Sequence, residues 1–118
     1  KNLLSWKLEI LELLNSLIDK HGPLVAKAFP GRAAIIIEYL GLNESHLLTV
    51  YEIKGSKKTG YYVPGTKIPI LPEAELFSKR HMPEIIVNLA WHIPNEVYAN
   101  LTDHGFSGHM VNIKDMPT

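Results

Sequence analysis

The chain has 118 residues, no cysteine and a formal net charge of zero, with 46% hydrophobic and 20% charged residues. This length and composition predict one folded domain. The charge balance argues against a general nucleic-acid or anionic-membrane binder, although a local basic patch stays compatible with it. The lack of cysteine excludes disulfides and thiolate metal sites. No apolar run approaches the ~20 residues of a membrane span and no signal-peptide pattern is present, so we expect a cytoplasmic protein.

The chain opens with the pattern of an amphipathic helix. Its apolar residues recur at spacings of three and four, as Leu3, Trp6, Ile10, Leu13, Leu14 and Leu17. Gly22 and Pro23 then end the helix. Because the pattern begins at once and the first residue is not methionine, we expect a piece of a longer protein, a single domain over 1–118. Residues 1–22 are the predicted N-terminal helix and 23–118 the predicted core.

Strand and helix patterns alternate through the predicted core. Strands are expected at 23–29, 47–53, 83–91 and 108–113, and helices at 33–40, 72–80 and 94–105. Such alternation with short loops predicts a parallel sheet that is covered by helices on both faces. We therefore expect an α/β, three-layer, Rossmann-like domain whose four-stranded parallel sheet has the order 2-1-3-4.

The segment YYVPGTKIPI, residues 61–70, mixes strand and turn chemistry. Pro64 and Gly65 suit a turn, and Ile68 to Ile70 suits a short edge strand, where the donor that Pro69 lacks is not needed. The segment follows the second strand, whose carboxyl end is where open α/β sheets bind ligands. We therefore expect Tyr62 and Thr66 near a ligand cleft.

The turn after the first strand lacks the glycines of a dinucleotide fingerprint. Ala26, Ala28 and Ala33 stand where glycine would let a pyrophosphate approach the backbone. This argues against an NAD or FAD site, and equally against a methyltransferase cofactor site, in these residues. Arg32, at the start of the next helix, is either a clamp for a phosphate or carboxylate or a solvated arginine.

The histidines do not form a metal site, because no pair has the i, i+4 spacing of a helical ligand pair. His92 directly follows the third strand, so it should lie at the carboxyl edge of the sheet. There it is either a base or hydrogen-bonding group for a ligand, or a hydrogen-bonded residue at the entry of the next helix. No nucleophile–base pair is recognisable, so we predict no catalytic residue.

Three stretches, GYYVPGTKIPILPEAEL, PEIIVNLAWHIPNEV and LTDHGFSGHMVNI, resemble the C-terminal domain of the sugar C-methyltransferase family. The similarity covers nearly all of the chain from Leu24 onward, and the Pro-Gly-Thr-x-Ile-Pro-Ile run is its most specific part. The family's enzymes use S-adenosylmethionine to methylate carbon in nucleotide-linked sugars. In the family, this domain follows an N-terminal zinc-binding domain and a central cofactor-binding domain.

The resemblance implies that the chain helps to form a substrate cleft for a nucleotide-linked sugar and does not bind the cofactor. Arg32, Tyr62, Thr66 and His92 are the expected substrate-binding residues, gathered at the carboxyl ends of the strands. The absent N-terminal and central domains are then its partners, and the isolated fragment should be inactive. The alternative is a non-catalytic interaction or regulatory module that docks a partner domain. An independent nucleotide-dependent oxidoreductase is disfavoured by the missing glycines.

Overall fold

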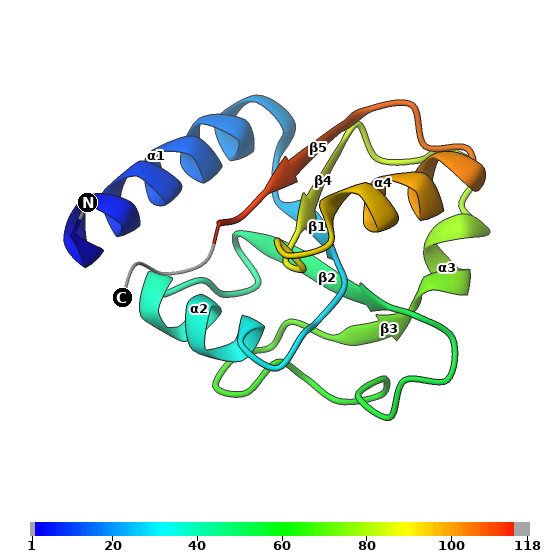
Figure 1. Ribbon diagram of the computed structural model, residues 1–118, viewed down its shortest axis with the longest axis horizontal. Helices are drawn as coiled ribbons and strands as arrows, with labels where there is room; N and C mark the ends of the chain where they lie inside the picture. Colours follow the sequence, from blue (N-terminus) through cyan, green and yellow to red (C-terminus); the bar gives the residue numbers. More distant parts are fainter. Residues whose placement is uncertain (1, 115–118) are drawn as a thin grey trace.

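Five parallel strands form one sheet in the order β3-β2-β1-β4-β5 in the computed structural model, which describes residues 2–114 (Figure 1). The strands are β1 (Leu24–Lys27), β2 (Leu47–Glu52), β3 (Ile70–Pro72), β4 (Ile85–Asn88) and β5 (His109–Asn112). The helices are α1 (Leu3–His21), α2 (Ala33–Leu40), α3 (Glu73–Phe77) and α4 (Pro94–Asp103). The α/β class and the parallel sheet expected from the sequence are confirmed.

The predicted strand count is wrong, because the sheet has five strands and not four. The four predicted strands are neighbours in the expected order, and β3 adds a fifth strand beside β2. β3 is only three residues long, with Ile70 opposite Val50 and Pro72 opposite Glu52. Pro72 is tolerated there because an edge strand does not need every backbone donor.

The two faces of the sheet bury different helices. One hydrophobic cluster contains residues of α1 and α2, such as Leu14 and Ile36, packed against Ala26 and Val87. The other contains Leu76 of α3 and Leu101 of α4, packed against Val25 and other strand residues. Successive strand residues face opposite sides of a sheet, so β1 and β4 supply both clusters and are buried along their whole length.

Helix α1 packs on its own domain. It begins at Asn2, whose side chain accepts a hydrogen bond from the Ser5 backbone N–H at 2.7 Å, and it ends at Gly22, which adopts a φ of 79°. Its buried residues are Trp6, Ile10 and Leu14. Leu13, which the spacing placed on the packed stripe, is instead exposed, as are Leu4 and Leu8.

The strand β5 approaches β4 closely at its start. The His109 N–H donates a hydrogen bond to the Glu84 carbonyl oxygen at 2.8 Å. Just before it, a Cβ on Gly108 would lie 2.0 Å from that same oxygen. Position 108 therefore requires glycine, because the two backbones lie too close together for a side chain. Within residues 2–114, no helix combines the length and the apolar character needed to cross a membrane.

Candidate functional site

Polar residues end four of the five strands at the carboxyl edge of the sheet. They are Lys27, Glu52, Asn88 and Asn112, and the first three are buried. Lys27 pairs with Asn88, and Asn88 with Asn112, so these three side chains share the face covered by α3 and α4. Glu52 follows Tyr51, which belongs to that face, and so points to the α2 side. Carboxyl edges of parallel sheets are where ligands bind in such folds.

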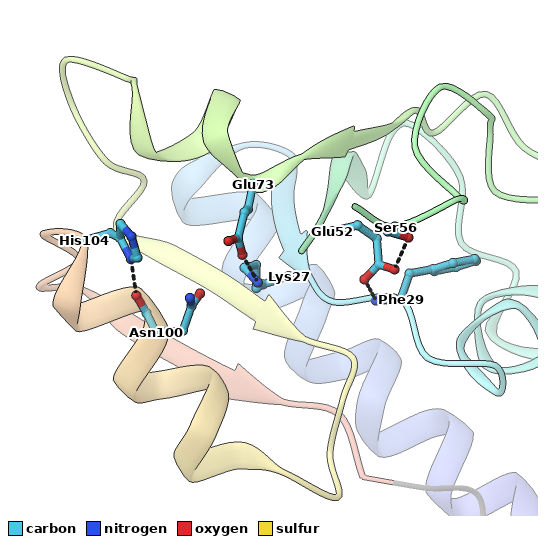
Figure 2. Close-up of polar contacts among 7 residues, drawn as sticks. All are labelled: Lys27, Phe29, Glu52, Ser56, Glu73, Asn100 and His104. Atoms are coloured by element: carbon cyan, nitrogen blue, oxygen red, sulfur yellow. Dashed lines mark hydrogen bonds and ion pairs between the residues drawn. The ribbon is translucent and has the colours of Figure 1, made fainter. Parts of the chain in front are cut away.

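Lys27 forms an ion pair across the α3 face, as Figure 2 shows. Its Nζ lies 2.9 Å from Oε1 of Glu73, the first residue of α3. The Lys27 side chain is only 2% exposed, which makes it a rare buried lysine in a central strand. The Glu73 oxygen lacks the geometry of a directed hydrogen bond, so the contact is mainly electrostatic. The pair fixes one oxygen of a carboxylate at the carboxyl edge.

Asn88 organises the turn that follows β4. Its amide nitrogen donates to Asn112 Oδ1 at 2.8 Å and to the Ala90 carbonyl at 3.2 Å. Its oxygen accepts from the Ala90 N–H at 2.8 Å. The amide thus has partners at both ends within the protein. Its role is to shape the turn that carries Trp91 and His92, and it is not offered to a ligand.

Glu52 holds the turn after β1 in place. One of its carboxylate oxygens accepts from the Phe29 N–H at 2.8 Å, and the other accepts from the Ser56 hydroxyl at 2.9 Å (Figure 2). The Lys58 ammonium donates to the Phe29 carbonyl. Ala28, next to it, adopts a φ of 72°, a conformation that residues other than glycine seldom take. The turn is therefore held by hydrogen bonds with Glu52 and Lys58 and contains one strained residue, Ala28.

This turn does not fit a cofactor diphosphate. In dinucleotide folds, free backbone amides of the first turn receive the phosphates. Here the Ala28 N–H donates to the Tyr51 carbonyl and the Phe29 N–H to the Glu52 carboxylate. A carboxylate beside the amides would also repel a phosphate. The residues present thus do not fit the diphosphate of a dinucleotide at this turn.

A hollow of about 590 Å³ opens beside the ends of β2 and β3 and runs along α3. Its lining includes Lys54, Glu73, Phe77 and His104. The His104 ring stacks on the Phe77 ring with centroids 3.9 Å apart. Its Nδ1 lies 2.7 Å from the carbonyl oxygen of Asn100. Because a carbonyl can only accept, Nδ1 carries the proton, and Nε2 of the neutral ring is an acceptor.

The structure brings two of the four predicted site residues to the carboxyl edge. Arg32 precedes α2 in the loop after β1, and His92 lies in the turn after β4. Both side chains are exposed, and the His92 ring meets the Trp91 ring edge-on at 5.2 Å. Their position agrees with the sequence, and their contact with a substrate stays a prediction.

The other two predicted residues lie elsewhere. Thr66 lines a hollow with Gly41 and Asn43, which follow the carboxyl end of α2, so it lies near the amino end of β2. Its hydroxyl donates to the Val63 carbonyl and accepts from the Ile68 N–H, which closes its own turn. Tyr62 is 62% exposed and forms an antiparallel bridge with Pro69 at the β3 edge. The expected gathering of all four residues is wrong.

Sequence reasoning missed the Lys27–Glu73 pair and the position of His104 in the hollow along α3. A lysine or asparagine that closes an apolar strand was the available signal, because Lys27 and Asn88 both directly follow buried residues. Their partners come from distant segments, which one sequence does not reveal. Among residues 2–114, no three histidine or acidic side chains gather in a way that could hold a metal ion.

Comparison with known protein families gives an informative match. A family model described as "C-methyltransferase C-terminal domain" matches residues 1–111. The match therefore includes helix α1 and extends into β5, and it covers more than nine-tenths of the chain. Comparison with curated proteins gives no match.

Proposed function

The chain belongs to the C-methyltransferase C-terminal domain family, and from this premise we propose that its carboxyl edge forms part of the substrate cleft of such an enzyme. The substrate class is a nucleotide-linked sugar, as the resemblance of the Pro-Gly-Thr-x-Ile-Pro-Ile run implies. The parent enzyme would use S-adenosylmethionine bound in another domain. N-terminal and central domains of the parent would complete the cleft, so the chain alone would be inactive.

The observation that carries this proposal is the hollow beside the ends of β2 and β3. It contains the Glu73 carboxylate, which the buried Lys27 positions, and an apolar wall around Phe77. It also contains the His104 imidazole, whose Nε2 can accept a hydrogen bond. Ligand pockets combine apolar walls with a few placed polar groups. A polyhydroxyl ligand could donate to Glu73 and His104. Arg32 and His92 lie on the same sheet edge, where we propose that they contact the rest of the substrate.

The hydrogen-bonded turn after β1 supports a role in substrate binding over a role in cofactor binding. Its amides at Ala28 and Phe29 already donate to Tyr51 and Glu52. A cofactor site there would need these donors released and the Glu52 carboxylate moved. The proposal therefore predicts weak binding of nucleotide sugars and no binding of S-adenosylmethionine.

Calorimetry and amide NMR of this chain with UDP-glucose and with S-adenosylmethionine test the proposal. We expect millimolar binding of UDP-glucose, with shifts at Glu73 and His104, and no response to S-adenosylmethionine. His104→Phe keeps a flat ring against Phe77 and removes the Nε2 acceptor, so it should weaken UDP-glucose binding, whereas the control His109→Phe should not. Micromolar binding of S-adenosylmethionine without a response to UDP-glucose would overturn the assignment.

In the parent enzyme, Arg32→Ala should raise the KM for the substrate several-fold and leave the melting temperature nearly unchanged. An exposed charge contributes little to stability, so the two effects are separable. A large fall in melting temperature at an unchanged KM would contradict a role for Arg32 in substrate binding.

One observation favours the alternative, a docking module. Leu4 and Leu8 on the outer side of α1 are 60% and 57% exposed, although the helix buries Trp6 and Ile10 in its own domain. Exposed leucines one turn apart are typical of a contact surface. Leu4→Ser with Leu8→Ser should then weaken binding to the other domains, expressed separately, without changing UDP-glucose binding by this chain.

A further inference from the structure

A hollow of about 670 Å³ lies at the amino edge of the sheet. It is formed where α1 ends, where β1 and β2 begin and where the chain enters β4, since most residues of 20–25 and of 79–85 line it together with Leu48. This is the opposite edge from the proposed substrate cleft. Nothing in the proposed function uses it.

Cationic and imidazole side chains from two distant segments meet in this hollow. Lys20 and His21 come from the last turn of α1, and Lys79 and His81 from the segment between α3 and β4. The only carboxylate in its lining, among the described residues, is that of Glu84, which lies 3.4 Å from His21 Nδ1. In a chain of zero net charge, this is a local excess of positive charge.

Helix ends alone do not explain the cluster. Lys20 and His21 lie in the last turn of α1, where cations complement the exposed carbonyls. Lys79 and His81, however, lie beyond the end of α3 at Phe77, and α3 has no basic residue in its last turn. Two of the four positions therefore need another reason for being basic.

The floor of the hollow is apolar. Leu48 is 51% exposed although it belongs to β2, and it lies with Pro23 and Pro83 over the buried residues Leu24 and Ile85. An exposed leucine that shares a hollow with two lysines suits a ligand that has both an apolar body and a charged head.

We propose that this hollow binds a small phosphate monoester with an apolar body. Lys20 and Lys79 would contact the phosphate from two sides, and His21 and His81 would add donors from their ring N–H groups. A phosphate offers several oxygens and close to two negative charges, which suits several separate donors better than a carboxylate does. Leu48 and the two prolines would cover the apolar body. The Glu84 carboxylate opposes this binding and limits the affinity.

Amide NMR titrations with phenyl phosphate and with inorganic phosphate test the site on the intact chain. We expect saturable shifts at residues 20–25 and 79–85 with both probes, and tighter binding of phenyl phosphate. Lys20→Gln and Lys79→Gln should each weaken binding about fivefold, the effect of one unit charge near 4 Å in a water-like medium. Glu84→Gln should strengthen it. The matched control Lys67→Gln, an exposed lysine outside the hollow, should change nothing.

Leu48→Ala separates the two halves of the proposed ligand. It should reduce the preference for phenyl phosphate over inorganic phosphate and leave the affinity for inorganic phosphate unchanged. Binding that all three lysine variants weaken equally, or that Glu84→Gln weakens, would show general attraction to the protein surface and overturn the site. So would saturable shifts confined to the carboxyl edge. The result is independent of UDP-glucose binding, which reports on the other edge of the sheet.

Discussion

Removing Glu73 should destabilise the fold more than removing Lys27, although the two form one pair. The Lys27 and Glu73 side chains are 2% and 16% exposed, and their charged atoms are 2.9 Å apart. At an effective dielectric constant of 20, their attraction is about 6 kcal/mol before desolvation is counted. Removing one partner of a buried pair costs roughly 3–5 kcal/mol, whereas replacing both by neutral groups is often close to neutral.

Glu73→Gln leaves a fully buried ammonium, so we expect the free energy of unfolding to fall by about 3 kcal/mol or more. Lys27→Met leaves a carboxylate that still reaches water, so we expect a smaller loss of about 1–3 kcal/mol. The double variant should recover most of the Glu73→Gln loss. Urea unfolding followed by circular dichroism measures all three, and 3 kcal/mol corresponds to roughly 12 °C in Tm. A Glu73→Gln loss below about 1 kcal/mol, or strictly additive losses, would refute the reasoning.

Two further predictions follow from backbone contacts. Gly108→Ala should destabilise the chain by about 1–3 kcal/mol or more, because its Cβ would lie 2.0 Å from the Glu84 carbonyl oxygen. Gly31→Ala, whose Cβ meets no atom within 4 Å, should unfold like the parent chain in the same melting experiment. Glu52→Ala should speed hydrogen exchange of the Phe29 amide, because the carboxylate that accepts its hydrogen bond is gone; unchanged exchange would show that another group protects this amide.

The sequence predicts the layers of the fold well because its signals are local. Buried runs such as Leu24–Lys27 and Ile85–Asn88 read as strands of a parallel sheet, and the stop at Gly22 ends α1 as expected. The sequence indicated a short edge strand at Ile68 to Ile70, whereas β3 spans Ile70–Pro72. Its three residues, one of them Pro72, gain their strand character from pairing with β2 and not from their own propensity.

The site was predicted less well because it depends on contacts between distant segments. Arg32 and His92 follow strands directly, so topology alone places them at the carboxyl edge. Thr66 was misplaced because the bridge between Tyr62 and Pro69 leads the segment back toward the amino end of β2. From the sequence, Lys27 is an ordinary residue at the end of a strand, because its partner Glu73 belongs to α3, a distant segment. No local pattern contains that information.

Buried and exposed polar side chains of this domain need different experiments. At the carboxyl edge, Lys27, Glu52 and Asn88 are buried and bonded to other parts of the chain, so changing them alters the fold before it alters a ligand contact. A loss of activity in such a variant would not assign a substrate role. His92, in the turn after β4, and His104, which follows α4, are both exposed, and substitutions there separate binding from stability. Substrate binding should therefore be mapped with the exposed histidines, and the buried residues should be tested by unfolding.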